Sequence, residues 1–411
     1  MSYKIEVEYI RDLAKKTVEY ANLPEMAEKK QLWKAHNSLN QKRPMLLVFP
    51  ECAWNELLPE KTLRCEDNKL RTIEKEIKMC LYQKEHFKHD LPIETDYVIN
   101  KCITDTGWGL DIHGSFGSKE GQETWGNNPV INSIADLEKL NSPIVHYDHK
   151  KTMEEYNYVG ELIGDIMNVK LKGIAHISFH LMQMYIGMRG FENMFYDLVD
   201  NPTLVHRTME KYVDGYKSML AQYEDMGLLS LNNDITYHST GGVGYTDQLP
   251  GKNYDQEKTM RYNMWGSAES QEMSVVSPAM HYEFAMQYEA QLLDGFPLTG
   301  YGCCEALDKK LDYVFRLPGI RRISVSPWAD VKLCAEKFED KYIYSWKPQP
   351  AMLCSEYNIK DIKKYVKNVL DVTKNNQIEI ILKDTVTCDN HPERFDNWTE
   401  TIYNMIMDYA K

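Results

Sequence analysis

The run from Gly300 to Glu305, GYGCCE, places two adjacent thiols beside a carboxylate. A short apolar stretch, Phe296 to Thr299, precedes it, and a polar, helix-like stretch follows. This order puts the run at the end of a predicted strand, where α/β barrels carry their chemistry. Thiolates and carboxylates are also ligand types that hold zinc. The alternative interpretation is that Cys303 and Cys304 are ordinary small buried residues.

The composition limits the classes of function. The chain has 411 residues, of which 43% are hydrophobic and 27% charged, and a net charge of −13. An acidic chain is a poor match for nucleic-acid phosphates or an anionic membrane surface, so we expect neither as a partner. No run of 18 apolar residues occurs, the N-terminus is charged, and the nine cysteines are scattered. We therefore expect no membrane span, no secretory signal, reduced thiols and a cytoplasmic location.

Short β-rich runs alternate with helical stretches along most of the chain. The apolar periodicity predicts helices over Ile5–Asn40, Lys69–His89, Phe191–Met226, Pro278–Asp294, Leu307–Leu317 and Asn358–Lys374. The predicted strands are Pro44–Pro50, Tyr97–Ile103, Gly173–Phe179, Leu228–Asn233, Asn263–Gly266, Phe296–Cys303, Arg321–Ser326, Tyr342–Trp346 and Ile378–Leu382. About eight such units favour a single (β/α)8 TIM-type barrel over residues 1–411, with residues 1–43 as an N-terminal helical extension.

Three other segments are interpreted from composition. The Gly-rich fingerprint of a dinucleotide-binding sheet is missing after the first strand. Gly241 to Gly244 has the wrong spacing for it, and indicates a flexible active-site loop or a plain turn. Asp105 to Asn128 is rich in Gly, Asp and Trp without periodicity, as in a loop or lid, and Glu393 to Tyr409 indicates a solvated helix.

Two segments of the second half resemble the uroporphyrinogen decarboxylase superfamily. Val276 to Phe284, VSPAMHYEF, is similar to its serine-proline helix start, and Ser277 and Pro278 suit an N-cap and a first helical position. Gly190 to Pro202 is similar to its paired-helix segment. The resemblance covers roughly residues 170 to 411 and implies a barrel with one of two chemistries. These are decarboxylation of a porphyrinogen and zinc-dependent methyl transfer to or from a corrinoid.

The first strand separates these two chemistries. Decarboxylases of the superfamily carry arginines there to grip acidic side groups, but Leu46 to Trp54 contains none. The stretches Gly300–Glu305, Ile323–Asp330 and Trp346–Pro350 look closest to corrinoid-dependent methyltransferase subunits of acetogen-type O-demethylases. That likeness implies transfer of a methyl group from a methyl ether, often an aryl one, to the Co(I) cobalamin of a partner corrinoid protein. The alternatives are a decarboxylase acting on a polycarboxylate, a methyltransferase using a thiol or amine, and a non-catalytic binding barrel.

The resemblance also implies a zinc site, with one departure. Methyltransferases of this superfamily carry His-x-Cys at a strand end and a second cysteine after the last strand. Here the first motif matches Tyr301-Gly302-Cys303, so a tyrosine replaces the histidine, and the second matches Cys388. We expect Zn²⁺, acting as a Lewis acid on the ether oxygen, to be held among Cys303, Cys304, Glu305 and Cys388. The alternative is that the cysteines are core residues and Glu305 is an acid at a helix N-terminus.

Other polar and apolar residues follow the predicted strands. Asp234, at the end of the Leu228 strand, is expected to be catalytic together with Glu305. Its role would be to donate a proton or to orient a neighbouring group, the alternative being a polar turn. A second group is expected to line the substrate pocket, with ordinary rim or core packing as the alternative; it comprises His180, Met184, Tyr185, His238, Glu269 and Tyr301. Of these, His238 is the possible replacement for the missing histidine ligand.

Overall fold

A seven-stranded, wholly parallel sheet organises the chain. The computed structural model describes residues 2–110, 129–255, 258–354 and 356–410. The strand order is β1-β11-β10-β9-β8-β7-β6. In chain order the strands are β1 (Met45–Val48), β6 (Ser178–Phe179), β7 (Trp265–Ala268), β8 (Leu298–Tyr301), β9 (Ile320–Val325), β10 (Ile343–Trp346) and β11 (Gln377–Leu382). Because every ladder is parallel, all seven strands end at the same edge of the sheet.

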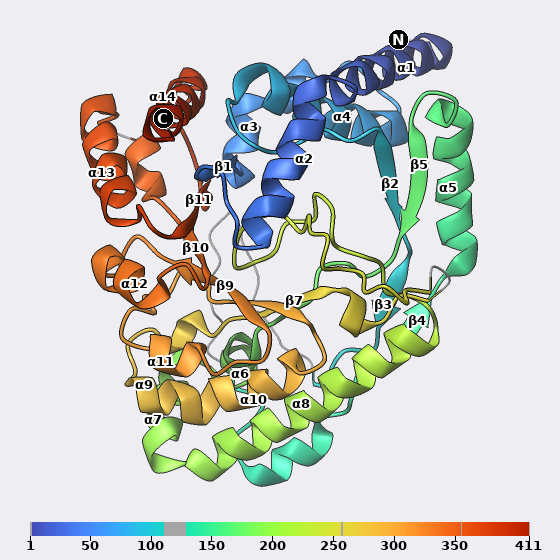
Figure 1. Cartoon of the computed structure of the whole chain (residues 1–411). Coiled ribbons are helices and arrows are strands. Elements are labelled where there is room, and N and C mark those ends of the chain that lie inside the picture. The colour runs from blue at the N-terminus through green and yellow to red at the C-terminus, as the bar shows by residue number, and fades with distance from the viewer. Residues whose placement is uncertain (1, 111–128, 256–257, 355, 411) are drawn as a thin grey trace.

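Helices surround the outside of this sheet (Figure 1). They are α6 (Leu181–Arg189), α7 (Phe191–Asp200), α8 (Pro202–Asp225), α9 (Pro278–His281), α10 (Gln287–Leu293), α11 (Leu311–Val314), α12 (Val331–Phe338), α13 (Ile359–Val372) and α14 (Glu393–Tyr409). The side chains of α13 show why they pack there: Ile362, Val366, Val369 and Leu370 are buried at helical spacing. No helix in the described residues is long and apolar enough to cross a membrane.

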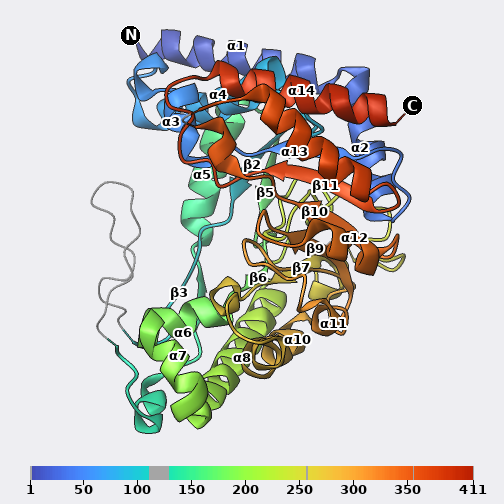
Figure 2. The ribbon, with the colours of Figure 1, turned by 90° about the vertical axis from the view of Figure 1, so that its left-hand side faces the viewer.

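The N-terminal part adds a layer of its own. Helices α1 (Tyr3–Ala21), α4 (Asn68–His86) and α5 (His149–Ile163) pack around a two-stranded parallel sheet of β2 (Asp96–Asn100) and β5 (Asn168–Lys172), with α2 (Pro24–Asn37) beside them (Figure 2). A short antiparallel pair, β3 (Ile103–Asp105) and β4 (Val145–Tyr147), and helix α3 (Trp54–Leu57) complete the elements. The Asp67 side chain accepts hydrogen bonds from the first amides of α4 and so fixes its start.

The structure corrects several predicted elements. The N-terminal helix and the Phe191 helix are each broken in two, because Pro24 and Pro202 start new helices. The Gly173 strand is displaced to β5 and β6, and the Leu307 helix shrinks to α11. Helix α14 is not fully solvated, since Phe395, Trp398, Ile402 and Ile406 are buried. Most of the predicted loop from Asp105 to Asn128 lies outside the described residues.

The predicted strand Leu228–Asn233 forms only an isolated parallel bridge, between Leu229 and Ile174. In the described residues no strand ladder joins the sheet edges β1 and β6, so the structure has the expected α/β class and parallel sheet without a demonstrated closed barrel. That residues 1–411 form one domain stays a prediction.

A buried ion pair occupies the concave side of the sheet. Arg322 on β9 and Glu379 on β11 lie 3.0 Å apart, from Nε to Oε1, and neither side chain is exposed. His36 of α2 lies 3.0 Å from Glu379, and Asn37 accepts a hydrogen bond from Arg322 at 2.6 Å. The loop around Gly242 covers this pair. Its φ is +62°, and a Cβ there would lie 2.4 Å from Arg322, so the position needs glycine.

This packing bears on whether Gly241 to Gly244 form a flexible active-site loop or a plain turn. All four residues are buried, and Asn37 donates hydrogen bonds to the carbonyls of Val243 and Tyr245 at 2.8 and 2.7 Å. The segment is therefore a packed part of the interior rather than a flexible loop.

We predict that Glu379→Gln lowers the free energy of unfolding at pH 7 by about 3–5 kcal/mol, because it leaves the Arg322 charge buried without its partner. Urea unfolding followed by circular dichroism measures this. The matched control is Glu210→Gln, which removes the exposed Arg207–Glu210 pair and should cost less than about 1 kcal/mol. Equal losses for the two variants would contradict the assigned importance of the buried pair.

The same pair predicts a pH dependence. Burial by itself raises the pKa of Glu379, but the Arg322 charge and the His36 hydrogen bond outweigh it and lower the pKa to about 2. Stability from this group is therefore complete above about pH 4.5 and is lost as the pH falls towards 2. The difference in the free energy of unfolding between the native chain and Glu379→Gln should therefore decrease as the pH falls from about 4.5 to 2. A difference that stays constant would contradict the assignment.

Candidate active site at the strand ends

Polar side chains from four strand ends gather at the carboxyl edge of the sheet. His180 follows β6, Glu269 follows β7, Cys303 follows β8 and Lys383 follows β11. Nδ1 of His180 lies 3.0 Å from Oε1 of Glu269, and Nζ of Lys383 donates to Sγ of Cys303 at 3.3 Å. The Cys303 thiol is also close enough to Glu269 to help lower the pKa of that carboxyl. These residues, with Cys304 and Glu305, are called the strand-end group.

The backbone turn after β8 positions the thiol and the carboxylate. Gly302 has a φ of +86°, and a Cβ there would lie 2.5 Å from Leu307, so only glycine fits the turn. The turn brings the Cys303 amide back onto Oε2 of Glu305, which accepts its hydrogen at 2.8 Å. The hydroxyl of Ser324 donates to the Cys303 carbonyl at 2.6 Å. The glycine at position 302 therefore has a structural reason.

The two neighbouring thiols differ in their surroundings. Sγ of Cys303 is 3.5 Å from Sγ of Cys304, which donates to Oδ2 of Asp384 at 3.4 Å. The hydrogen bond with Cys304, followed by burial, raises the pKa of Cys303, and the Lys383 charge opposes this only in part. Cys303 is therefore a neutral thiol at pH 7. Cys304 is half-buried, whereas Cys303 is buried.

Two carboxyl groups in this group keep an unsatisfied oxygen. Oε2 of Glu269 and Oε1 of Glu305 are buried without a hydrogen-bond partner, although the residues are only 5% and 2% exposed. Burial followed by the Glu269 charge raises the pKa of Glu305. Burial also raises the pKa of Glu269, but hydrogen bonding to His180 outweighs it and lowers the pKa overall. One carboxyl therefore favours the acid form and its neighbour the carboxylate form, a separation suited to proton transfer.

A third carboxyl lies behind these two. Glu289 on α10 accepts hydrogen bonds from Ser270 at 2.6 Å and from the Tyr301 hydroxyl at 2.8 Å. Burial raises its pKa to about 8. Nε2 of His281 lies 3.0 Å from the same Tyr301 hydroxyl. The tyrosine that replaces the expected histidine is thus fully buried and engaged by Glu289 and His281, between the sheet and the helices, and does not contact the thiols.

The predicted zinc ligands are not assembled around one point. Cys303, Cys304 and Glu305 are adjacent, but the Cys388 thiol donates to Oε2 of Glu56 at 3.0 Å. Burial followed by that hydrogen bond raises the pKa of Cys388 to about 12, which opposes the thiolate form that zinc binds. No group of three or more His, Cys, Asp or Glu side chains in the described residues is arranged to hold a metal ion. The four-residue set therefore does not fit zinc as it stands.

The remaining predicted residues lie apart from the strand-end group. Asp234 accepts hydrogen bonds from Lys172 at 2.6 Å and from the Thr236 amide at 2.8 Å, as a polar turn would. His238 is buried against Trp265 in the interior, and burial holds its pKa well below the usual range. Tyr185 donates to Asp197 at 2.8 Å within the core, where Met184 also packs. Of the expected pocket residues, His180 and Glu269 contact each other through their side chains, and the Met184 amide donates to the His180 carbonyl at 3.2 Å.

Three members of the site were missed in the sequence. Lys383 and Asp384 directly follow the last predicted strand, so the strand-end rule that selected Glu305 would also have selected them. Glu289 carries no such signal, because it lies inside an amphipathic helix and its burial depends on the tertiary fold.

The comparisons with known proteins add little. No protein-family model matches the sequence, and no curated protein matches it. Among solved structures, the chain is similar to a methyltransferase from Methanosarcina mazei, with 11% identity over 91% of this chain and 99% of that chain, and a TM-score of 0.47. Similarity at this level is too low to argue for a shared chemistry.

We predict that Glu269→Gln lowers the pKa of His180. Burial lowers this pKa, but the hydrogen bond and charge of Glu269 outweigh it and raise the pKa above its usual value. Removing the carboxylate leaves burial dominant. Nuclear magnetic resonance titration of the histidine C2 protons measures the change, with Glu400→Gln, in an exposed pair with Lys88, as the control. An unchanged His180 titration would rule out this coupling.

Proposed function

We propose that this chain is a corrinoid-dependent methyltransferase that takes a methyl group from a methyl ether, most simply an aryl one, and passes it to the Co(I) cobalamin of a separate corrinoid protein in the cytoplasm. The observation that carries the proposal is the strand-end group, in which a buried carboxylic acid and a carboxylate lie beside two thiols. The sequence resemblance supplies the reaction class. The proposal includes a closed eight-stranded barrel, with residues 228–233 in the position of the eighth strand.

The chemistry divides between the partner's cofactor and this chain. The corrinoid supplies the nucleophile, which no side chain in the strand-end group can match. Breaking the carbon–oxygen bond leaves negative charge on the ether oxygen, so a proton donor at that oxygen lowers the barrier. Glu305 is placed for this role, because its Oε1 is buried without a partner. Glu269 stays ionised and holds His180 in position at 3.0 Å.

A zinc ion is not assigned a step here. The thiol of Cys388 is engaged by Glu56, and the Lys383 ammonium lies on Cys303. Both of these hydrogen bonds would have to break before the four predicted ligands could surround one zinc ion. Zinc dependence stays a prediction, tested by metal analysis of the purified chain before and after dialysis against a chelator.

Exposed apolar side chains after three strands suit a docking partner. Val275, Trp328 and Val386 are 79%, 70% and 71% exposed, and they lie in the segments that follow β7, β9 and β11. All three segments leave the edge of the sheet that carries the strand-end group. Apolar residues on such a rim favour a transient protein interface there, as delivery of a corrinoid on a separate protein requires.

The direct test incubates the chain with a reduced corrinoid protein and a panel of methyl donors, and follows the cobalt absorption spectrum. The panel contains aryl methyl ethers, a methyl thiol and a methylamine. Methylation of the corrinoid by an aryl methyl ether supports the proposal. Methylation by the thiol or the amine alone would mean that the chain uses a different class of methyl donor. Loss of carbon dioxide from a polycarboxylate, without any change at cobalt, would replace it with a decarboxylase.

We predict that Glu305→Gln lowers kcat for methyl transfer by about 10²–10⁴-fold, since the amide cannot donate the proton that Glu305 supplies. Folding should be preserved, because the amide oxygen can still accept the hydrogen of the Cys303 amide. Glu336→Gln, exposed on α12, is the matched control and should leave kcat unchanged. A Glu305→Gln chain with full activity would remove Glu305 from the mechanism.

We predict that Trp328→Ser raises KM for the corrinoid protein by about tenfold while leaving kcat with free cobalamin unchanged, because the exposed indole serves the partner and not the reaction. The control is Tyr196→Ser on α7, which is 66% exposed away from the strand ends. Equal effects on free cobalamin and on the corrinoid protein would contradict the docking role.

A further inference from the structure

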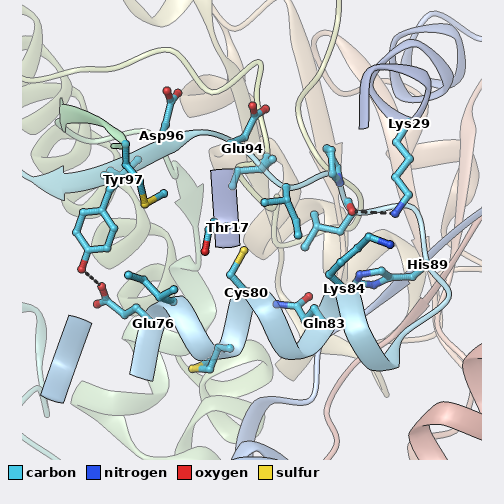
Figure 3. Close-up of a pocket in the computed structure, with 18 of the residues that line it drawn as sticks. Thr17, Lys29, Glu76, Cys80, Gln83, Lys84, His89, Glu94, Asp96 and Tyr97 are labelled. Atoms are coloured by element: carbon cyan, nitrogen blue, oxygen red, sulfur yellow. Dashed lines mark hydrogen bonds between the residues drawn. The ribbon is translucent and has the colours of Figure 1, made fainter. Parts of the chain in front are cut away.

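A cavity lies between α4 and the segment that leads into β2 (Figure 3). Its volume is about 440 Å³, within the usual range for small-molecule sites. It shares no residue with the strand-end group. The lining comes mainly from α4, β2 and the residues just before β2, with single residues from α1 and α2.

The middle of this cavity is apolar. Ile77 and Cys80 of α4 face Ile93 and Val98 of the β2 segment, and Met167 closes the wall. Cys80 is half-buried, and burial raises its pKa to about 11, so it is a neutral thiol at pH 7. This region can hold a hydrocarbon or aromatic body but offers little to a polar one.

One end of the cavity carries nitrogen groups without matching acceptors. His89 is 3% exposed, and its Nδ1 has no hydrogen-bond partner. Lys29 of α2 lies above it in Figure 3 and donates to the Leu91 carbonyl at 3.3 Å, but forms no ion pair with a carboxylate of the described residues. Burial lowers the pKa of Lys29, against the charges of Asp90 and Glu25. A half-buried ammonium without a paired carboxylate and a buried imidazole nitrogen without a hydrogen-bond partner therefore line the same end of the cavity.

The carboxylates at the opposite end are already engaged. Glu76 accepts a hydrogen bond from the Tyr97 hydroxyl, and Asp96 accepts from Asn168 at 2.8 Å and from Lys170 at 2.6 Å. The charge that lacks a partner is thus confined to the Lys29 end, and it is positive. The group missing from the cavity is an anion there, joined to an apolar body that extends along α4.

We propose that this cavity binds a small monocarboxylate with an apolar body, its carboxylate between Lys29 and His89 and its body against Ile77 and Cys80. The carboxylate gains a charge-assisted hydrogen bond from Lys29 and a second one from His89, while the chain loses an uncompensated charge and an unsatisfied polar atom. This site is independent of the methyl-transfer proposal.

The test is isothermal titration calorimetry of the full chain with octanoate and, separately, with octan-1-ol. These probes share the apolar body and differ in charge. Octanoate should bind at least about tenfold more tightly than the alcohol, as expected for one charged hydrogen bond. Lys29→Met should weaken octanoate binding by about tenfold or more, and Cys80→Trp, which fills the cavity, should abolish it. Lys364→Met, an exposed lysine on α13, is the control and should bind as the native chain does.

Far-ultraviolet circular dichroism establishes whether each variant is folded. If Cys80→Trp does not fold, the comparison of Lys29→Met with the native chain still tests the proposal. The proposal is overturned if the native chain does not bind octanoate, or if octan-1-ol binds equally well. It is also overturned if Lys29→Met binds octanoate as tightly as Lys364→Met.

Discussion

The buried pair of Arg322 and Glu379 is the constraint on which the rest of the structure depends. Two opposite charges on β9 and β11 face into the sheet, and neither has access to water. The cost of burying such a pair falls as its remaining donors and acceptors find partners, although Nη1 of Arg322 has none. Helix α2 supplies His36 and Asn37, and the loop at Gly242 covers the pair. The pair is therefore packed between the sheet, α2 and the Gly242 loop.

The carboxyl edge of the sheet concentrates groups that are costly to bury. Glu269, Glu289 and Glu305 lie close enough for each to affect its neighbour's ionisation, and His180 and Lys383 supply the nearby positive charge. As a result, the pKa of Glu305 is raised and that of Glu269 is lowered. Two carboxyl groups whose pKa values are driven apart in this way are a common basis for acid–base chemistry, and the separation arises here from burial of Glu305 and from the contact of Glu269 with His180.

The sequence predicted those parts of the fold that depend on local pattern. Apolar runs located six of the seven sheet strands to within a few residues, and Cys303, Cys304 and Glu305 do follow the end of β8. Contacts between side chains that are distant in the sequence could not be predicted from these local patterns. Tyr301 was expected to line the substrate pocket, but its hydroxyl donates to Glu289, which lies 12 residues earlier on a helix. Cys388 was expected beside Cys303, but Glu56, 332 residues away in sequence, accepts its hydrogen. Neither partner leaves a periodic signal in the chain.

The central claim is that the strand-end group breaks a methyl–oxygen bond and gives the methyl group to a corrinoid partner. A single-turnover experiment with an aryl ether carrying a ¹³C-labelled methoxy group, the full chain and the reduced corrinoid protein tests it most directly. The account predicts that the label moves to the corrinoid and that one phenol is released for each methyl group transferred. Label that remains in the ether, while the chain acts on a thiol, an amine or a polycarboxylate, would contradict it.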